Sequence, residues 1–250
     1  MDFSNRTALI TGSGQGVGEG IARALASNGA NVCLVGRTLS KVESVANDIN
    51  KTGGSAIAIE CDVKSNDSIN SSIEAVLSKF NSLNILINNA QEVPLGNILD
   101  VTDESFINGW DSGPLATFRF MKACYPYLKG GGKIINLASS SALRPDLNSY
   151  GAYAAVKESI RSLSRAAAVE WGPDNILVNC IMPLAKSAGM DWWMSEHPDE
   201  ANEFLKTIPL GRVGDCKDDI GKAVCHILSD GMNYITGSTI MLDGGQAYLR

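Results

Sequence analysis

Short apolar runs and longer periodic stretches alternate along the whole chain. The runs predict strands at residues 7–11, 31–36, 55–60, 83–88, 133–139, 176–181 and 238–243. Stretches in which apolar residues recur at helical spacing predict helices at 17–28, 39–51, 66–80, 103–128, 151–171 and 217–229. The strand runs are continuously apolar, as in a parallel sheet that helices cover on both faces. The pattern predicts an α/β, doubly wound fold of about seven parallel strands, in one domain spanning residues 1–250.

One predicted helix, 103–128, has a break in the middle of its pattern. Gly113 and Pro114 stand side by side there. Proline lacks an amide hydrogen and clashes with the preceding turn, at about 3 kcal/mol in a helix interior. Glycine costs about another 1 kcal/mol relative to alanine. We therefore expect the helix to bend at this pair.

Composition and charge narrow the class of protein. The 250 residues are 44% hydrophobic and 19% charged, with a net charge of −6 and no Lys/Arg-rich run, which disfavours nucleic acid and anionic membranes as partners. No apolar run approaches the roughly 18 residues of a membrane span, and the N-terminus lacks a signal-peptide pattern. The six cysteines form no CxxC pair, so we expect reduced thiols and a cytoplasmic location. With only two histidines, we expect no metal site.

Glycines cluster between the first predicted strand and the first predicted helix. Such a turn lets the backbone approach a pyrophosphate at the positive end of the helix. The alternative, a plain turn, is less favoured in this strand–turn–helix context. We predict a nucleotide site formed by Gly12, Ser13, Gly14, Gln15, Gly16, Val17 and Gly18.

The end of the second predicted strand bears on the kind of nucleotide. An NAD site usually places Asp or Glu about twenty residues beyond the glycines, but this chain has Gly36 followed by Arg37. A guanidinium suits a 2′-phosphate by its charge and its forked geometry. We therefore predict NADP(H) as the preferred cofactor, with NAD(H) as the alternative. A solvated surface arginine is the plainer interpretation of Arg37.

Tyr153 and Lys157 lie four residues apart on a predicted helix and so share one face. A tyrosine hydroxyl has an unperturbed pKa of about 10, and a nearby ammonium lowers it. The pair then becomes a plausible proton donor to a carbonyl. A packed tyrosine beside a solvent-seeking lysine is the plainer interpretation.

The order and spacing of several motifs resemble the short-chain dehydrogenase/reductase family. The motifs are TGxxxGxG at 11–18, CDV at 61–63, NNA at 88–90, serines at 139–141, YxxxK at 153–157 and VNCIMP at 178–183. The resemblance covers essentially the whole chain. It implies a Rossmann fold and hydride transfer between nicotinamide C4 and a carbonyl or secondary alcohol carbon.

The resemblance also implies roles for individual residues. Tyr153 is the general acid/base, and Lys157 lowers its pKa and binds the nicotinamide ribose. Ser139 hydrogen-bonds the substrate oxygen, with Ser140 and Ser141 as alternatives. Further cofactor contacts fall on Asp62, Val63, Asn88, Asn89, Ala90, Gln91, Pro183 and Ser187. Family members commonly form homotetramers, so a homotetramer or homodimer is expected.

Three positions depart from the family's pattern, all near the expected nicotinamide. Gln91 and Leu184 each replace a glycine, and Gly113 stands where most members have a catalytic asparagine. The nearest upstream asparagine is Asn108. We expect a water to fill the volume left at Gly113 and still to reach Lys157.

Residues 184–210 correspond to the family's variable substrate lid. They include four large apolar residues, Met190, Trp192, Trp193 and Met194. Such side chains favour a bulky apolar or ring-containing carbonyl or alcohol. The alternative is that both tryptophans belong to the core or to a subunit interface.

Two classes of function stay open. The leading prediction is an NADP(H)-dependent carbonyl reductase or alcohol dehydrogenase. The alternative is a catalytically weak or inactive NADP(H)-binding sensor or scaffold that lacks the asparagine. Retention of Ser139, Tyr153 and Lys157 favours the enzyme. A hydrolase has little support, because the chain has no GxSxG motif.

Overall fold

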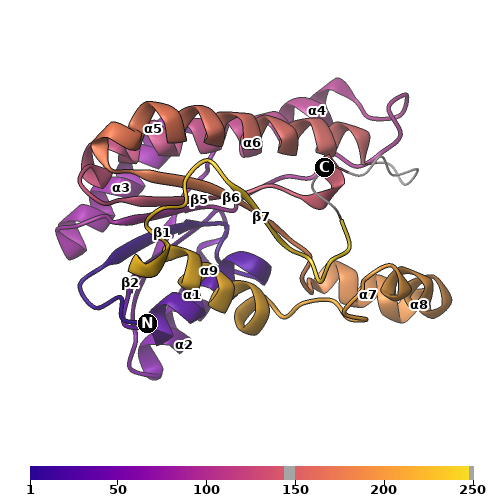
Figure 1. The fold of residues 1–250 in the computed structure, drawn as a ribbon, viewed down its shortest axis with the longest axis horizontal. Coiled ribbons are helices and arrows are strands. Elements are labelled where there is room, and N and C mark those ends of the chain that lie inside the picture. Colours follow the sequence, from indigo (N-terminus) through magenta and orange to yellow (C-terminus); the bar gives the residue numbers. More distant parts are fainter. Residues whose placement is uncertain (144–149, 248–250) are drawn as a thin grey trace.

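A seven-stranded parallel sheet forms the centre of the computed structural model, which describes residues 1–143 and 150–247 (Figure 1). The strand order is β3-β2-β1-β4-β5-β6-β7, and every neighbouring pair is parallel. The strands are β1 (Thr7–Thr11), β2 (Asn31–Gly36), β3 (Ser55–Glu60), β4 (Ile85–Asn88), β5 (Lys133–Leu137), β6 (Leu177–Pro183) and β7 (Thr239–Leu242). The predicted doubly wound α/β fold is confirmed.

Helices cover both faces of this sheet (Figure 1). One layer holds α1 (Gly16–Ser27), α2 (Leu39–Lys51) and α9 (Lys222–Leu228). The other holds α3 (Asn66–Phe80), α4 (Asp103–Trp110), α5 (Ala116–Leu128) and α6 (Gly151–Trp171). Two further helices, α7 (Ala188–Glu196) and α8 (Pro198–Lys206), project beyond the end of the sheet.

A separate apolar core lies under each helix layer. Ile10 of β1 packs with Ile21 and Val224 on one face, and Leu9 packs with Phe120 on the other. Successive residues of a strand point to opposite faces, so both must be apolar when both faces are covered. This is the physical reason for the continuous apolar runs in the sequence.

The order in which strands are added to the sheet reverses at β1, which pairs with β2 on one side and with β4 on the other. The connections that follow β1 and β4 leave in opposite directions, and ligands of doubly wound sheets bind in the crevice that this creates. The glycine turn after β1 and the Asn89 loop after β4 meet at this point.

The predicted helix 103–128 is three elements in the structure. α4 ends at Trp110, α5 begins at Ala116, and Asp111–Leu115 forms a wider π-type turn that contains Pro114. The hydrogen bonds of such a turn reach five residues back, which accommodates the bend expected at Gly113 and Pro114.

Within the described ranges, no helix is long and apolar enough to cross a membrane. In the same part of the chain, no group of three or more His, Cys, Asp or Glu side chains is arranged to hold a metal ion. The six cysteines are free thiols.

Candidate active site

Tyr153, Ser139 and Lys157 come together where β5 ends and α6 begins. Ser139 and Tyr153 line the same cavity, and Ser139 Oγ accepts from the Ser141 N–H at 3.2 Å. Lys157 Nζ lies 5.6 Å from the centre of the Tyr153 ring and donates to the Leu137 carbonyl oxygen at 2.8 Å. Ser139, the serine preferred from the sequence, thus lies close enough to the tyrosine to affect its pKa.

Burial controls the protonation of this pair. It raises the pKa of Tyr153 to about 12, although the Ser139 hydrogen bond acts in the opposite direction. Burial also lowers the pKa of Lys157 to about 7. We expected the lysine to lower the tyrosine's pKa, but loss of hydration dominates in this structure. The tyrosine is therefore protonated at neutral pH, which is the state that a proton donor needs.

The glycine turn after β1 forms a groove at the N-terminus of α1. A Cβ on Gly18 would lie 2.5 Å from Asn89 Nδ2 and 2.6 Å from the Gly12 carbonyl oxygen, so the position requires glycine. Asn89 Nδ2 donates to the carbonyl oxygens of Thr11 and Gly12 at 2.9 Å each. Gly16 has φ +59° and open space where its Cβ would be. This open backbone cradle fits the pyrophosphate of a nicotinamide dinucleotide.

The far end of this groove, which has a volume of about 330 Å³, holds a cluster of charges. Arg37 Nη1 donates to Glu92 Oε1 at 2.6 Å, and Lys64 Nζ lies 3.2 Å from the same oxygen. Lys41 Nζ donates to Gln15 Oε1 at 2.9 Å. Sequence reasoning missed Lys41 and Glu92, although Lys41 stands one helical turn after Arg37 and could have been found by that spacing.

The other predicted cofactor residues occupy different places. Ser13 is fully buried, where its hydroxyl donates to β1 at 2.9 Å and accepts from β2 at 3.0 Å, and Val17 packs against the core. The Asp62 carboxylate accepts from the Lys64 N–H at 3.0 Å. The groove itself is lined by Gly12, Gly14, Gln15, Gly16, Arg37, Val63, Asn89, Ala90 and Gln91. The side chains of Ser13 and Val17 thus hold the turn together from within.

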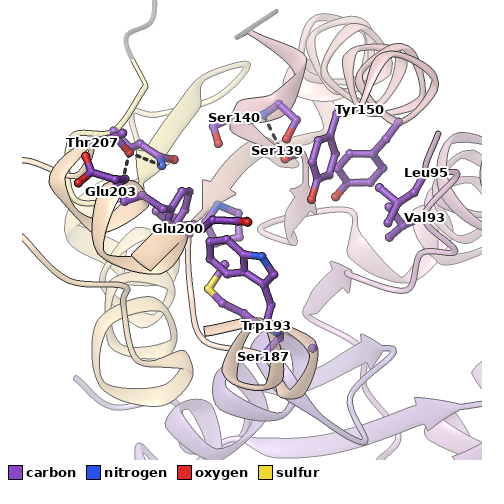
Figure 2. Close-up of a pocket in the computed structure, with 18 of the residues that line it drawn as sticks. Val93, Leu95, Ser139, Ser140, Tyr150, Ser187, Trp193, Glu200, Glu203 and Thr207 are labelled. Atoms are coloured by element: carbon purple, nitrogen blue, oxygen red, sulfur yellow. Dashed lines mark hydrogen bonds between the residues drawn. The ribbon is translucent and has the colours of Figure 1, made fainter. Parts of the chain in front are cut away.

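A larger cavity, of about 1930 Å³, reaches Ser139 and Tyr153. Figure 2 shows Ser139 and Tyr150 on one side of it and Trp193, from α7, on another. Trp193 packs edge-on against Phe204, with ring centres 5.8 Å apart. The preceding residue, Trp192, is 63% exposed and also lines the cavity. One tryptophan of α7 therefore packs against α8 while its neighbour stays open to solvent.

Pro183 and Ser187, both predicted to contact the cofactor, line this cavity too. Ser187 Oγ accepts from the Met190 N–H at 3.1 Å and caps the start of α7. Leu184, which replaces a family glycine, lies between them and pairs with β7 through a 3.0 Å hydrogen bond to Leu242. The loop after β6 thus joins the sheet to α7.

The two departures at residues 91 and 113 occupy the same volume. A Cβ on Gly113 would lie 2.3 Å from Gln91 Oε1, so the Gln91 carboxamide fills the space beside Gly113. The expectation that water fills this volume is therefore wrong. Asn108 does not take the place either, because its Oδ1 accepts from Lys64 Nζ at 3.3 Å.

Comparisons with known proteins place these features in one family. A family model described as enoyl-(acyl carrier protein) reductase matches residues 12–247. The 12alpha-hydroxysteroid dehydrogenase of Clostridium sp. (strain ATCC 29733 / VPI C48-50) is 38% identical over 252 residues, covering 97% of each chain.

Two solved structures extend the likeness to the fold. A short-chain type dehydrogenase/reductase from Mycobacterium ulcerans has a TM-score of 0.92 and 27% identity, over 98% of this chain and 91% of that one. The 3-ketoacyl-(acyl-carrier-protein) reductase from Brucella melitensis, complexed with NADH, has a TM-score of 0.88 and 28% identity, over 98% and 99% of the two chains.

The chain belongs to the short-chain dehydrogenase/reductase family. It is an oxidoreductase that transfers a hydride between NAD(H) or NADP(H) and a carbonyl or secondary alcohol. The resemblance inferred from the motifs is confirmed, and the non-catalytic alternative gains no support from these relatives.

Proposed function

We propose that Tyr153 exchanges a proton with the substrate oxygen while Ser139 orients that oxygen. The supporting observation is that both side chains line the 1930 Å³ cavity, where Ser139 lowers the pKa of Tyr153 against the effect of burial. The nicotinamide supplies or accepts the hydride when it is bound. Lys157 Nζ keeps hydrogens beyond the one bonded to Leu137, and these would hold the ribose.

The charges at the far end of the groove support NADP(H) as the preferred cofactor. Arg37 and Lys41 place two cations along one wall, and a 2′-phosphate would replace Glu92 as the partner of Arg37. NAD(H) is the alternative, because the Glu92 carboxylate can accept hydrogen bonds from ribose hydroxyls. The Brucella melitensis relative was solved with NADH.

For the substrate we infer a fused-ring ketone or alcohol of steroid size. The cavity is wide and is lined in part by Val93, Leu95, Trp192 and Trp193, and the 38% identical relative is a hydroxysteroid dehydrogenase. Residues 184–210 act as the substrate lid in this proposal. Apolar walls bury a rigid ring system at a low entropic cost.

A substrate panel with all four nicotinamide cofactors tests these assignments. It contains steroids with an oxo or hydroxyl group at different ring positions, small aliphatic carbonyls and 3-oxoacyl thioesters. We expect the highest kcat/KM for a steroid with NADP(H). Turnover confined to the thioesters would overturn the substrate class. Cofactor binding without turnover on any compound would favour the sensor alternative.

We also propose a homotetramer, or a homodimer, formed through the α4–α6 layer. Apolar side chains are exposed on these helices at Phe106, Ile107, Trp110, Phe118 and Val169. Light scattering should give four, or two, times the 26.5 kDa of one chain. A cytoplasmic location, supported by the free thiols, and a single domain over 1–250 remain predictions.

A further inference from the structure

The bend between α4 and α5 lacks one amide hydrogen. The π-type turn spans Asp111–Leu115, and the Ala116 N–H bonds to the Asp111 carbonyl five residues back. Pro114, inside this turn, has no N–H to donate. Gln91 Nε2 donates to the Gly109 carbonyl oxygen at 2.8 Å. A side chain from the loop after β4 thus adds a donor at the turn where the proline lacks one.

The same loop is joined to the bend at a second point. Ser112 Oγ accepts from the Glu92 N–H at 2.9 Å and donates to the Asn108 carbonyl oxygen at 2.7 Å. The second hydrogen on Gln91 Nε2 bonds to the Glu92 carbonyl oxygen at 2.6 Å. The Gln91 carboxamide is therefore held in one orientation from both sides.

Gly113 completes this arrangement by having no side chain. Its Cβ would lie 2.3 Å from Gln91 Oε1 and 3.0 Å from both Cδ and Nε2. Glycine 113 is buried, so the carboxamide has little room to move away. A side chain at position 113 would therefore displace the Gln91 carboxamide and break the two hydrogen bonds that Nε2 makes.

The bend matters for the site because α6 packs against it. This helix carries Tyr153 and Lys157. Gln91 also lines the cofactor groove, and its Oε1 is buried without a hydrogen-bond partner among the described residues. A buried carbonyl oxygen without a donor is unfavourable, so the orientation of the carboxamide is set by its Nε2 hydrogen bonds.

We propose that Gln91, Gly113 and Pro114 form one co-dependent unit in which Gln91 is a positioning residue. Its Nε2 closes the bend that supports α6, and the volume beside residue 113 is reserved for a single carboxamide. The kinetic part of this proposal rests on the proposed function, whereas its structural part does not.

A carboxamide transfer tests the positioning role. Gly113→Asn alone should lower kcat/KM at least tenfold because two carboxamides compete for one volume, and Gln91→Ala alone should lower it about tenfold because none remains. The Gln91→Ala/Gly113→Asn double variant should recover to within about threefold of the wild type, mainly through kcat at unchanged carbonyl KM. A double variant as slow as the slower single variant would overturn the proposal.

A second double-mutant cycle measures only the unfolding temperature, so its outcome does not depend on the proposed enzymatic activity. Gly113→Ala should lower the unfolding temperature by about 5 °C through overpacking, and by less than half as much in the Gln91→Ala background. Gly172→Ala is the matched control, because no atom lies within 4 Å of its Cβ position, and it should leave the temperature unchanged. Equal effects of Gly113→Ala in both backgrounds would show that residues 91 and 113 are independent, against the proposal.

Discussion

The cofactor groove and the substrate cavity both lie at the carboxyl ends of the strands but are built in different ways. At the glycine turn the groove consists of backbone in close contact, as at Gly18, where a Cβ would come within 2.5 Å of Asn89. The cavity is closed by α7 and α8, in which Ala201 is the one buried side chain among those described. Trp192 on this lid is 63% exposed.

This difference separates what the fold fixes from what it leaves adjustable. The groove follows from where β1 and β4 end, so its shape is set by the sheet. The lid has few buried contacts of its own, and such segments open at low free-energy cost. We therefore expect substitutions near the groove to cause large changes in activity or binding, and substitutions in the cavity wall to cause small ones.

Tyr153→Phe should have the largest effect, because it removes the hydroxyl of the proposed general acid/base at the cavity wall. Loss of a positioned general acid/base costs about 10²–10⁴-fold in rate, and we expect a fall in kcat of about 10³-fold. Cofactor affinity, measured by fluorescence titration, should change less than twofold because the hydroxyl is not part of the glycine turn. A variant that keeps a tenth of the wild-type kcat would falsify the assignment.

Lys157→Met should change how stability depends on pH. Folding lowers the pKa of this lysine from 10.5 to about 7, so between these values the unfolded chain binds more protons. Stability of the wild type therefore gains from this group as pH rises, by up to about 1.4 kcal/mol per pH unit. The variant lacks that contribution. Urea unfolding of the cofactor-free proteins at pH 7, 8, 9 and 10 gives the free energy of unfolding of the variant minus that of the wild type. This difference should shrink as pH rises, and a difference that does not change with pH would contradict the lowered pKa of Lys157.

Arg37→Ala should raise the Kd for NADPH about tenfold, since a charge-assisted hydrogen bond contributes about 1.5–3 kcal/mol. The Kd for NADH should change less than twofold. Glu92→Gln is the matched variant and should change the Kd for NADPH in the opposite direction. It removes the carboxylate that bonds Arg37 at 2.6 Å, so NADPH should bind about threefold more tightly. Equal changes for NADH and NADPH in both variants would show that this end of the groove does not select the cofactor.

Trp192→Ala should have the smallest effect on the fold. The side chain is mostly exposed, so the free energy of unfolding should change by less than about 0.5 kcal/mol. KM for the bulky substrate should rise about threefold, while KM for a small carbonyl stays the same. Equal KM changes for large and small substrates would remove the contrast drawn between groove and cavity.

Much of the fold follows from local pattern. The seven strands were predictable because a strand covered on both faces must be apolar at each position, as Leu9 and Ile10 show in their separate cores. The interruption of the helix at Gly113 and Pro114 was predictable from the chemistry of these two residues. The boundaries within 103–128 were not, since the turn there also contacts the Gln91 side chain from the loop after β4.

The site divides in the same way. Tyr153 and Lys157 share a helix, so their spacing brings them together wherever that helix lies. The role of Ser139 beside the substrate oxygen was expected from a family resemblance, and the structure places Ser139 and Tyr153 at the same cavity. The predicted lowering of the pKa of Tyr153 was wrong, because burial raises it. Burial depends on how the whole molecule packs, and the spacing of residues in the sequence does not reveal it.

By itself the sequence determined the order of strands and helices, the glycine turn and the tyrosine–lysine pair, because each depends on residues close together in the chain. The tertiary structure alone decided that Lys41 reaches Gln15, that Glu92 holds Arg37 and that Gln91 fills the space beside Gly113. The third contact joins residues 22 positions apart after β4, whereas the first two contacts join segments that follow different strands. They form only when the crossover helices bring the ends of β1, β2 and β4 to one edge of the sheet.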